Sequence, residues 1–324
     1  MMNNKKILIT GVAGFIGSNL AEAFLNKGCE VIGLDNFATG KPENIEQLLK
    51  KNAFTFQEGD IRNRAILDKI MPGTDAVLHQ AALGSVPRSI KDPVTSIDVN
   101  ITGTTNVFFA AHQHNVKRVV YAASSSTYGD SEDLPKVEHK IGKPLSPYAI
   151  SKYVNEIIAE NFHQIYGLDT IGLRYFNVFG KRQDPQSTYA AVIPKFVSQL
   201  MQLESPRING DGSYSRDFTY VENVILANML ALETPDPEAL NKVYNVACGD
   251  RTSLNELFAL IKKELIRHNP KIQTIEPTYG AVRNGDVPHS LASIELAQKH
   301  LGYNPKYTVG QGLTEAIDWY WNNL

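Results

Sequence analysis

Short apolar runs alternate with longer amphipathic stretches along the first half of the chain. The runs predict strands over residues 5–10, 30–34, 53–57, 76–79, 118–122 and 169–175, and the amphipathic stretches predict helices over residues 18–27, 42–51, 62–70, 93–115 and from residue 148 onward. Strands that alternate with helices are typical of a parallel sheet covered on both faces. The pattern therefore predicts an α/β fold with a Rossmann-type, doubly wound parallel sheet.

This alternation ends near residue 175. A polar loop over residues 176–188 is followed by helices predicted over residues 189–203, 221–232, 253–267 and 311–321, with a strand over 243–246 and a strand and loop over 275–285. We expect a first domain over residues 1–176 and a smaller, mixed α/β domain over residues 177–324. The chain is expected to cross back to the first domain near residues 216–232.

Composition excludes several classes of protein. The chain has 324 residues, 43% of them hydrophobic and 20% charged, and a formal net charge of −2. These values give no indication of a nucleic-acid or membrane partner. No apolar run reaches the roughly 20 residues that a membrane-spanning helix needs. Cys29 and Cys248 make no disulfide framework and the eight histidines have no metal-ligand spacing, so we expect a cytoplasmic protein without a metal.

A glycine-rich turn follows the first predicted strand. Gly11, Gly14 and Gly17 are spaced G-x-x-G-x-x-G and lead into a helix, and Asp35 ends the next strand 18 positions after the last glycine. Such glycines let a backbone approach a pyrophosphate, which the free N–H groups of the helix N-terminus can bind. An acid at the end of the second strand can accept from ribose hydroxyls and repels a 2′-phosphate. This arrangement favours NAD over NADP.

Two further strand ends fit a cofactor site at the same edge of the sheet. Gly59-Asp60-Ile61 fits an adenine pocket, and Gln80-Ala81-Ala82 fits a close backbone approach to a cofactor. Ordinary loops at strand ends are the alternative for both segments. Because ligands bind at the carboxyl ends of parallel strands, and the glycine turn lies there too, we favour the cofactor site.

Tyr148 and Lys152 form a candidate acid–base pair. Ser146 is a good N-cap and Pro147 a good first-turn residue, so a helix is expected to begin here and to place the pair on one face. A neighbouring ammonium is expected to lower the pKa of the phenol toward the working pH. Ser124 ends a predicted strand and could hydrogen-bond the substrate oxygen that Tyr148 deprotonates. An ordinary amphipathic helix and a capped strand end are the alternatives.

The chain resembles the extended short-chain dehydrogenase/reductase family over nearly its whole length. The matching motifs are GVAGFIG at 11–17, LDN at 34–36, GDI at 59–61, YAISK at 148–152, LRYFNVFG at 173–180, SRDF at 215–218 and RNGD at 283–286. The resemblance implies that Tyr148 is the catalytic base, that Lys152 binds the ribose and that Ser124 orients the substrate. It implies an NAD site made by Gly11, Gly14, Phe15, Ile16, Asp35, Asn36, Thr39, Gly40, Asp60, Ile61, Gln80, Ala81, Ala82, Asn100, Lys152, Tyr175 and Val178.

The strand end at Ser124 separates the reactions known in this family. Related dehydratases and decarboxylases carry an acid just after the serine or threonine of this strand end, whereas Ser124 is followed here by Ser125, Ser126 and Thr127. The GDP-fucose synthases have a reactive cysteine nearby, and this chain has none there. The resemblance therefore implies a 4-epimerase, in which NAD takes a hydride from C4 of a nucleotide sugar and returns it to the opposite face.

The late motifs resemble a UDP-sugar site. Arg216 and Arg283 match diphosphate-binding arginines, Asp286 a ribose-binding acid and Asn177 a diphosphate contact, while Ala191, Val192, Lys195 and Asn209 align with positions beside the uridine. Gly84, Ser85, Ser124, Asn177, Gln183 and Ser290 resemble the sugar site of bacterial epimerases that prefer UDP-N-acetylglucosamine (UDP-GlcNAc) and UDP-N-acetylgalactosamine (UDP-GalNAc), and the small Ser290 leaves space for the acetamido group. The resemblance implies Ser125, Ser126 and Tyr148 as further substrate contacts.

Alternatives stay open at this point. They are a UDP-N-acetylhexosaminuronic acid 4-epimerase, for which Arg88 is a candidate cation, a nucleotide-sugar reductase, a UDP-glucose 4-epimerase and a non-catalytic NAD-binding protein. A role in polysaccharide biosynthesis is expected by resemblance alone. The resemblance also implies a homodimer, in which the helices that start at Pro93 and near Tyr148 pair as a four-helix bundle.

Overall fold

A seven-stranded parallel sheet is the centre of the molecule. The structure is a computed structural model that describes residues 4–184, 191–282 and 287–324. The strands lie in the order β3-β2-β1-β4-β5-β6-β11. They are β1 (Lys6–Thr10), β2 (Glu30–Asp35), β3 (Phe54–Glu58), β4 (Ala76–His79), β5 (Arg118–Ser124), β6 (Thr170–Tyr175) and β11 (Lys242–Val246). The predicted Rossmann-type sheet is therefore confirmed, and its order reverses between β1 and β4, where such sheets bind ligands.

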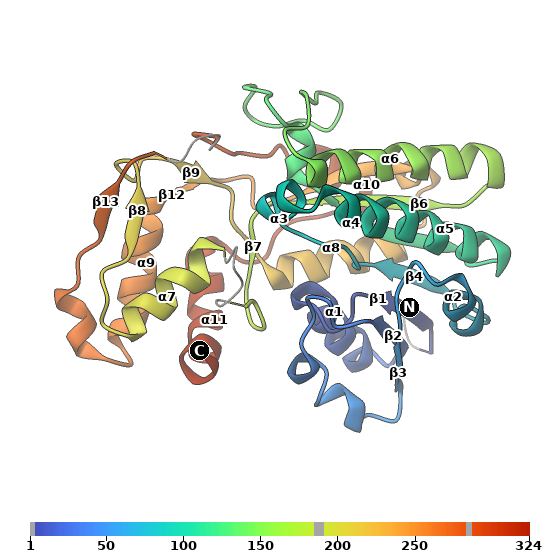
Figure 1. Ribbon diagram of the computed structural model, residues 1–324, viewed down its shortest axis with the longest axis horizontal. Helices are drawn as coiled ribbons and strands as arrows, with labels where there is room; N and C mark the ends of the chain where they lie inside the picture. The colour runs from blue at the N-terminus through green and yellow to red at the C-terminus, as the bar shows by residue number, and fades with distance from the viewer. Residues whose placement is uncertain (1–3, 185–190, 283–286) are drawn as a thin grey trace.

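Helices cover both faces of this sheet (Figure 1). Side chains alternate along β1, so that Ile7 and Ile9 belong to one apolar cluster and Leu8 to another. The first face carries α1 (Phe15–Asn26), α8 (Val221–Glu233) and α10 (Glu295–Leu301), and the second carries α2 (Arg64–Ile70), α5 (Gly103–Gln113) and α6 (Pro147–Tyr166). Burial on two sides explains why the strands read as continuous apolar runs.

A second group of elements lies beside the sheet (Figure 1). Its helices are α7 (Val192–Met201), α9 (Leu254–Ile266) and α11 (Val309–Asn323), and they share an apolar cluster. Three two-stranded pairs accompany them: β7 (Val178–Phe179) with β10 (Thr219–Tyr220), β8 (Arg207–Asn209) with β13 (Thr278–Gly280), and β9 (Ser215–Arg216) with β12 (Thr252–Ser253). After β10 the chain returns to the central sheet, where α8 packs on β5, β6 and β11. The division into domains of residues 1–176 and 177–324 stays a prediction.

Some helices differ from the sequence-based expectation. The helix predicted over residues 42–51 is wrong: two 3₁₀ turns occur at Pro42–Asn44 and Leu48–Lys50, and the Asn44 side chain donates to Ala13 O at 2.8 Å, which ties the first of them to the glycine turn. The helix predicted over residues 93–115 is interrupted by a π-helical segment, Asp98–Thr102, between α4 (Pro93–Ile97) and α5. α3 (Val86–Lys91) and α10 were not predicted.

Candidate active site

Two of the three glycines in the turn after β1 leave no room for a side chain. Gly11 has φ +70°, and a Cβ there would lie 2.7 Å from Ala81 N. A Cβ at Gly17 would lie 2.1 Å from Gly11 O. Gly14 caps α1 without a side-chain hydrogen bond, so the first N–H groups of the helix face outward. The turn therefore offers backbone donors and a positive helix end to an anion.

Asp35 and Asp60 lie at the carboxyl ends of β2 and β3. The Asp35 carboxylate accepts from Ala13 N at 2.9 Å and Phe37 N at 2.8 Å, and burial raises its pKa against these hydrogen bonds. A carboxylate has about four acceptor positions, so the backbone donors leave capacity for a ribose hydroxyl. Asp60 binds Arg62 at 2.7 Å, and this hydrogen bond lowers the pKa of Asp60.

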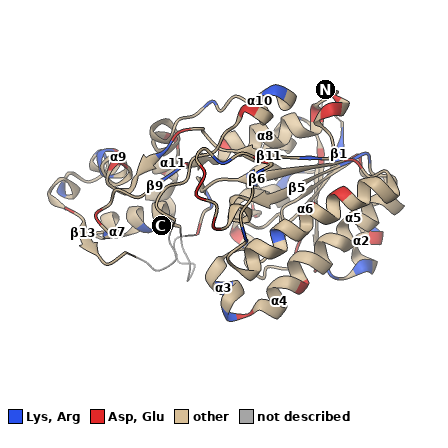
Figure 2. Ribbon diagram, turned by 90° about the horizontal axis from the view of Figure 1, so that it is seen from above, with Lys and Arg blue, Asp and Glu red and all other residues tan. Residues whose placement is uncertain are grey.

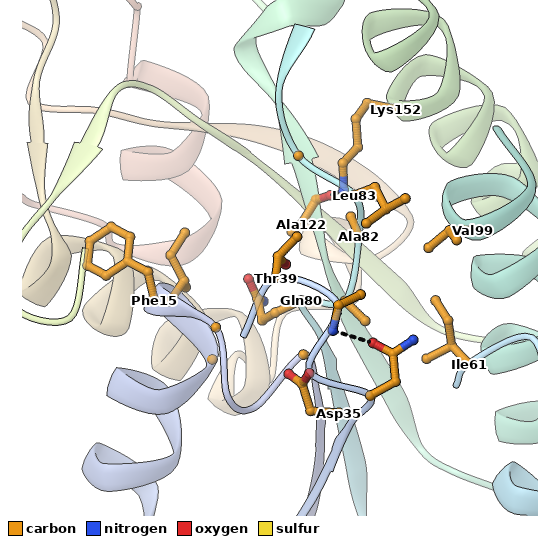
Figure 3. A pocket seen from close by; sticks show the side chains of 18 of the residues that line it. Phe15, Asp35, Thr39, Ile61, Gln80, Ala82, Leu83, Val99, Ala122 and Lys152 are labelled. Atoms are coloured by element: carbon orange, nitrogen blue, oxygen red, sulfur yellow. Dashed lines mark hydrogen bonds between the residues drawn. The ribbon is translucent and has the colours of Figure 1, made fainter. Parts of the chain in front are cut away.

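These residues line one cavity of about 490 Å³, within the usual range for ligand sites. Figure 3 shows Lys152 pointing toward Ala122, with Gln80, Thr39 and Asp35 on the side of the glycine turn. The predicted site residues that line it are Gly11, Gly14, Phe15, Ile16, Asp35, Asn36, Thr39, Asp60, Ile61, Gln80, Ala81, Ala82, Gly84, Ser124, Tyr148, Lys152, Tyr175, Asn177 and Val178.

The cavity fits a dinucleotide by its donors and acceptors. Gln80 Nε2 donates to Tyr175 OH at 3.2 Å, and Asn228 Nδ2 donates to the same hydroxyl at 3.0 Å. Gln80 Oε1 is buried and has no hydrogen-bond partner among the described residues. A buried acceptor of this kind is costly unless a ligand supplies a donor. The N–H groups of the glycine turn, the Asp35 carboxylate and Gln80 Oε1 suit a pyrophosphate, ribose hydroxyls and a further donor.

Tyr148, Ser124 and Lys152 meet at one end of this cavity. The predicted helix start is confirmed, because Ser146 Oγ accepts from Ala149 N at 3.1 Å and α6 begins at Pro147. Burial raises the pKa of the Tyr148 hydroxyl, and a hydrogen bond with Ser124 opposes this shift. Ser124 Oγ also accepts from Ser126 N at 3.2 Å, so it caps the strand end as well.

Lys152 does not act on Tyr148 as the sequence suggested. Its Nζ donates to Ala122 O at 2.8 Å, and burial lowers the pKa of Lys152 to about 8, a shift that the charge of Glu156 opposes. The predicted lowering of the Tyr148 pKa by Lys152 is therefore wrong for this arrangement, in which burial outweighs the other influences on the phenol.

A second cavity of about 210 Å³ lies beyond Asn177, which lines both. Val192, Lys195, Asn209 and Arg216 of the predicted uridine and diphosphate positions line it. Asn177 has φ +37° and its Nδ2 donates to Asp217 O at 3.1 Å, which fixes the side chain between the two cavities. Three cationic side chains, Lys195, Arg207 and Arg216, give this cavity the chemistry of an anion site.

Several predicted site residues do not line a cavity but hydrogen-bond to segments near one. Asn100 lies in the π-helical segment, where its Oδ1 accepts from Leu83 N at 2.8 Å and its Nδ2 donates to Ser151 Oγ at 3.0 Å. Ser85 Oγ caps α3, and Gln183 Nε2 donates to Val178 O at 2.9 Å.

The other predicted positions also lie outside the cavity linings. Gly40 packs on Ala13, Ser125 and Ser126 form a 3₁₀ turn, Ala191 precedes α7, and Ser290 N donates to Ser215 O at 3.1 Å. Arg283 and Asp286 lie outside the described residues.

Sequence reasoning missed part of each lining. In the second cavity these residues are Phe196, Arg207, Ile208, Tyr214, Phe218, Leu254 and Val282. Arg207 stands two residues before Asn209 in the run Pro206-Arg207-Ile208-Asn209, so the polar loop signal could have included it. In the first cavity the missed residues are Ala38, Arg62, Leu83, Thr95, Val99, Ala122 and Ala123, and of these Arg62 stands only two positions after the predicted Asp60.

Residues 181–184 bind the elements around the glycine turn. Lys181 Nζ and Arg182 Nη2 lie 2.7 and 3.1 Å from Glu22 Oε2 on α1, and Asp184 lies 2.9 Å from Lys41 Nζ. We call residues 181–184 the clasp, because their ion pairs connect the polar loop after β7 to α1 and to Lys41 on the cofactor side of the sheet.

Within residues 4–184, 191–282 and 287–324, no group of three His, Cys, Asp or Glu side chains has the geometry of a metal site. In the same part of the chain no helix has the length and apolar character that crossing a bilayer requires. Lys and Arg are interspersed with Asp and Glu along the helices in Figure 2.

Comparison with known proteins identifies the family. The model of the NAD dependent epimerase/dehydratase family matches residues 7–247. A putative UDP-glucose 4-epimerase of Methanocaldococcus jannaschii is 36% identical, over 98% of this chain and 99% of that protein. The structure of a UDP-N-acetylglucosamine 4-epimerase from Methanobrevibacter ruminantium M1, in complex with UDP-N-acetylmuramic acid, is 38% identical with a TM-score of 0.92 and covers 99% of this chain and 100% of that one.

A UDP-glucuronic acid 4-epimerase from Bacillus cereus, in complex with UDP-glucuronic acid and NAD, is 29% identical with a TM-score of 0.87, over 98% of this chain and 100% of that one. The family match and the relatives agree with the doubly wound parallel sheet. The chain belongs to the NAD dependent epimerase/dehydratase family, and its cofactor is NAD.

Proposed function

We propose that this UDP-sugar 4-epimerase interconverts UDP-GlcNAc and UDP-GalNAc. The observation that carries the proposal is the junction of the two cavities at Asn177, with Tyr148 in the first and Arg216 in the second. A UDP-sugar that spans this junction has its hexose near Tyr148 and its diphosphate near the cations. The 38% identity to the epimerase of Methanobrevibacter ruminantium supports an N-acetylated sugar.

Each residue at the junction has a chemical task. As the phenolate, Tyr148 takes the proton of the sugar 4-hydroxyl, and as the phenol it returns that proton to the 4-keto oxygen after the sugar has turned over. Ser124, which hydrogen-bonds Tyr148, donates to the same sugar oxygen. NAD supplies the acceptor for the C4 hydride and holds it until its return. Lys152, whose Nζ donates to Ala122 O beside the same cavity, binds the nicotinamide ribose.

Tight binding of the diphosphate keeps the intermediate in the site between hydride removal and hydride return. The 4-keto sugar must rotate about its diphosphate without leaving, so binding energy is needed away from C4. Lys195, Arg207 and Arg216 supply it in the second cavity. Arg207 and Arg216 suit paired contacts with phosphate oxygens.

Small residues support the acetylated sugar. Gly84 lines the first cavity, and a Cβ there would meet no atom within 4 Å, so this wall leaves room for a 2-acetamido group. The similarity to the Bacillus cereus enzyme keeps a uronic acid as the second candidate, for which Arg88 on α3 is the candidate cation.

Product analysis tests the proposal. Protein that retains NAD is incubated with UDP-GlcNAc, UDP-glucose, UDP-glucuronic acid and the N-acetylated uronic acid, without added oxidant. We expect UDP-GalNAc to form fastest. A faster reaction with a uronic acid or with UDP-glucose would overturn the sugar assignment, net oxidation of NADH would indicate a reductase, and no turnover on any of the four would indicate a binding protein.

The Tyr148→Phe variant is the matched control for the chemistry. It keeps the ring in place and removes the hydroxyl, so NAD content should be unchanged while turnover falls by about 10²–10⁴-fold. An unchanged rate would refute the role of Tyr148.

We also propose that two copies pair as a four-helix bundle, to which each copy contributes α6 and the continuous helical run from α4 to α5. Ile90 on α3, Val94 on α4 and Ile157 on α6 are 62%, 77% and 49% exposed, and α3, α4 and α6 contact one another. A face of this kind is typical of an isologous dimer interface. Val94→Glu should convert a dimer into a monomer in light scattering, and a wild-type monomer would refute the pairing.

A further inference from the structure

Asp217 is a fully buried acid for which the mechanism above has no use. It is 0% exposed and stands between β9 and β10, next to Arg216 of the second cavity. It belongs to the Ser-Arg-Asp-Phe motif at 215–218, in which Arg216 and Phe218 line the second cavity. Buried carboxylates are rare unless they are paired or hydrogen-bonded, so its contacts define its task.

The Asp217 carboxylate accepts three backbone N–H groups from two distant segments. Oδ1 accepts from Cys248 N at 2.9 Å, and Oδ2 accepts from Gly249 N at 3.1 Å and Ala292 N at 3.3 Å. The first segment follows β11, and the second precedes α10. The Asp217 side chain therefore connects the loop after β11, at the end of the central sheet, to the segment of residues 287–292.

The segment held by Asp217 lies against the residues of the second cavity. Ser215 N donates to Pro288 O at 3.1 Å, Ser290 N donates to Ser215 O at 3.1 Å, and Arg216 Nη1 donates to Pro288 O at 3.2 Å. The backbone of Asp217 itself accepts from Asn177 Nδ2 at 3.1 Å. Asp217 thus fixes the relative positions of the three chain segments that carry Asn177, Arg216 and Ser290.

We propose that Asp217 is a positioning residue that sets the affinity for the UDP-sugar by fixing Arg216 and Asn177 against the 287–292 segment. The inference rests on the proposed function, because it concerns the same substrate site. Asp217 reaches neither cavity and touches no reacting atom, so it acts through these neighbours.

Protonation of Asp217 would weaken the hydrogen bonds that hold these segments together. Burial raises the pKa of Asp217 to about 7, against the lowering by the three backbone hydrogen bonds, and Asp250 adds to the rise. The other titratable or charged groups around it are Cys248 in the loop after β11, Tyr303 after α10, Arg216 on β9 and His289, whose Nδ1 lies 2.9 Å from Ser215 Oγ. Below pH 7 one oxygen becomes a hydroxyl, and an N–H group loses its acceptor.

The pH dependence of KM tests the inference in the wild-type holoenzyme. If only the ionised form of Asp217 binds, the competent fraction falls from about 0.9 at pH 8 to about 0.1 at pH 6, and KM rises about tenfold. The diphosphate of a UDP-sugar does not titrate in this range. His289→Gln should keep the rise, whereas a KM that is constant between pH 6 and 8 would overturn the inference.

Asp217→Asn is the matched substitution, since it keeps the size and removes the charge and one acceptor. At pH 8 we expect KM to rise roughly tenfold, the factor for one lost hydrogen bond to a charged group, with kcat within about twofold and NAD content unchanged. Its KM should no longer change with pH. Asp250→Asn, at an exposed neighbour, should match the wild-type KM at pH 8. A wild-type KM in Asp217→Asn would overturn the inference.

Binding of UDP at pH 8 separates this inference from the proposed function. If the wild type binds UDP and Asp217→Asn binds it equally well, the inference fails while the function stands. If the wild type does not bind UDP, both fail. Where Asp217→Asn does not fold, the wild-type KM between pH 6 and 8 decides alone.

Discussion

Glu156 and Arg174 form an ion pair that burial makes sensitive to the loss of one partner. Their side chains are 7% and 4% exposed, and Arg174 binds both carboxylate oxygens, at 2.9 and 2.7 Å. Arg174 also donates to Glu138 O at 3.0 Å and lies 4.8 Å from the ring centroid of Tyr128. Burial opposes the charge of Arg174, but the hydrogen bonds to Glu156 outweigh it and raise the pKa of Arg174.

The perturbation is Glu156→Ala, which leaves the guanidinium buried without its counter-ion. Removal of one partner from a buried pair costs about 3–5 kcal/mol, because the remaining charge keeps its desolvation penalty. At about 2 °C per kcal/mol for a chain of this size, Tm should fall by about 6–10 °C. The double substitution Glu156→Leu with Arg174→Met removes both charges and should recover a large part of this loss.

The coupling is measured by thermal and urea unfolding of a double-mutant cycle made of the wild type, Glu156→Leu, Arg174→Met and the double variant, with Glu156→Ala unfolded in parallel. Glu276→Gln is the control, because Glu276 pairs with Lys262 at 2.8 Å but is 75% exposed, and such a pair is worth less than about 1 kcal/mol. The reasoning would be refuted if Glu156→Ala lost no more stability than this control. A double variant that lost the sum of the two single losses would refute it equally.

Three further predictions follow from the cofactor side of the molecule. Gly17→Ala places a Cβ 2.1 Å from the backbone oxygen of Gly11, so the purified protein should contain little NAD. Gly14→Ala, whose Cβ would lie 3.1 Å from the same oxygen, should retain more NAD. Equal NAD contents in the two variants would contradict the steric argument. Burial lowers the pKa of Lys152 to about 8, so the amine is charged below pH 8 and neutral above it; kcat/KM should fall above pH 8, and Lys152→Arg should remove this limb. Asp184→Asn breaks the contact with Lys41 and should speed the loss of NAD on dilution by a few-fold, measured by fluorescence; an unchanged rate would exclude the clasp from cofactor retention.

Local signals predicted the sheet and the helix that begins at Pro147. The six predicted strands of the first half pair in parallel because their apolar runs are buried on both faces, and burial of this kind is visible in the sequence itself. The Ser146 cap and the spacing of Tyr148 and Lys152 are equally local, which is why their placement on one helix was predictable.

Features that depend on distant partners were not predictable. Residues 42–51 have a helical pattern, yet the contact of Asn44 with Ala13 at the glycine turn favours tight turns instead. The pKa of Tyr148 depends on burial by the folded chain, which no spacing reveals. Asp217 reads as one more surface acid, because its three donors lie 31, 32 and 75 positions away.

The last strand of the central sheet comes late in the chain. All six residues of β6 are buried, and β11 covers its outer edge only after the 71 residues from 176 to 246 have been added. At about 5–20 residues per second, synthesis of that stretch takes about 4–14 s. During this time each new chain presents β6 as an open, apolar edge that can pair with another chain. Expression of residues 1–176 alone would make that interval permanent, so such a fragment should aggregate.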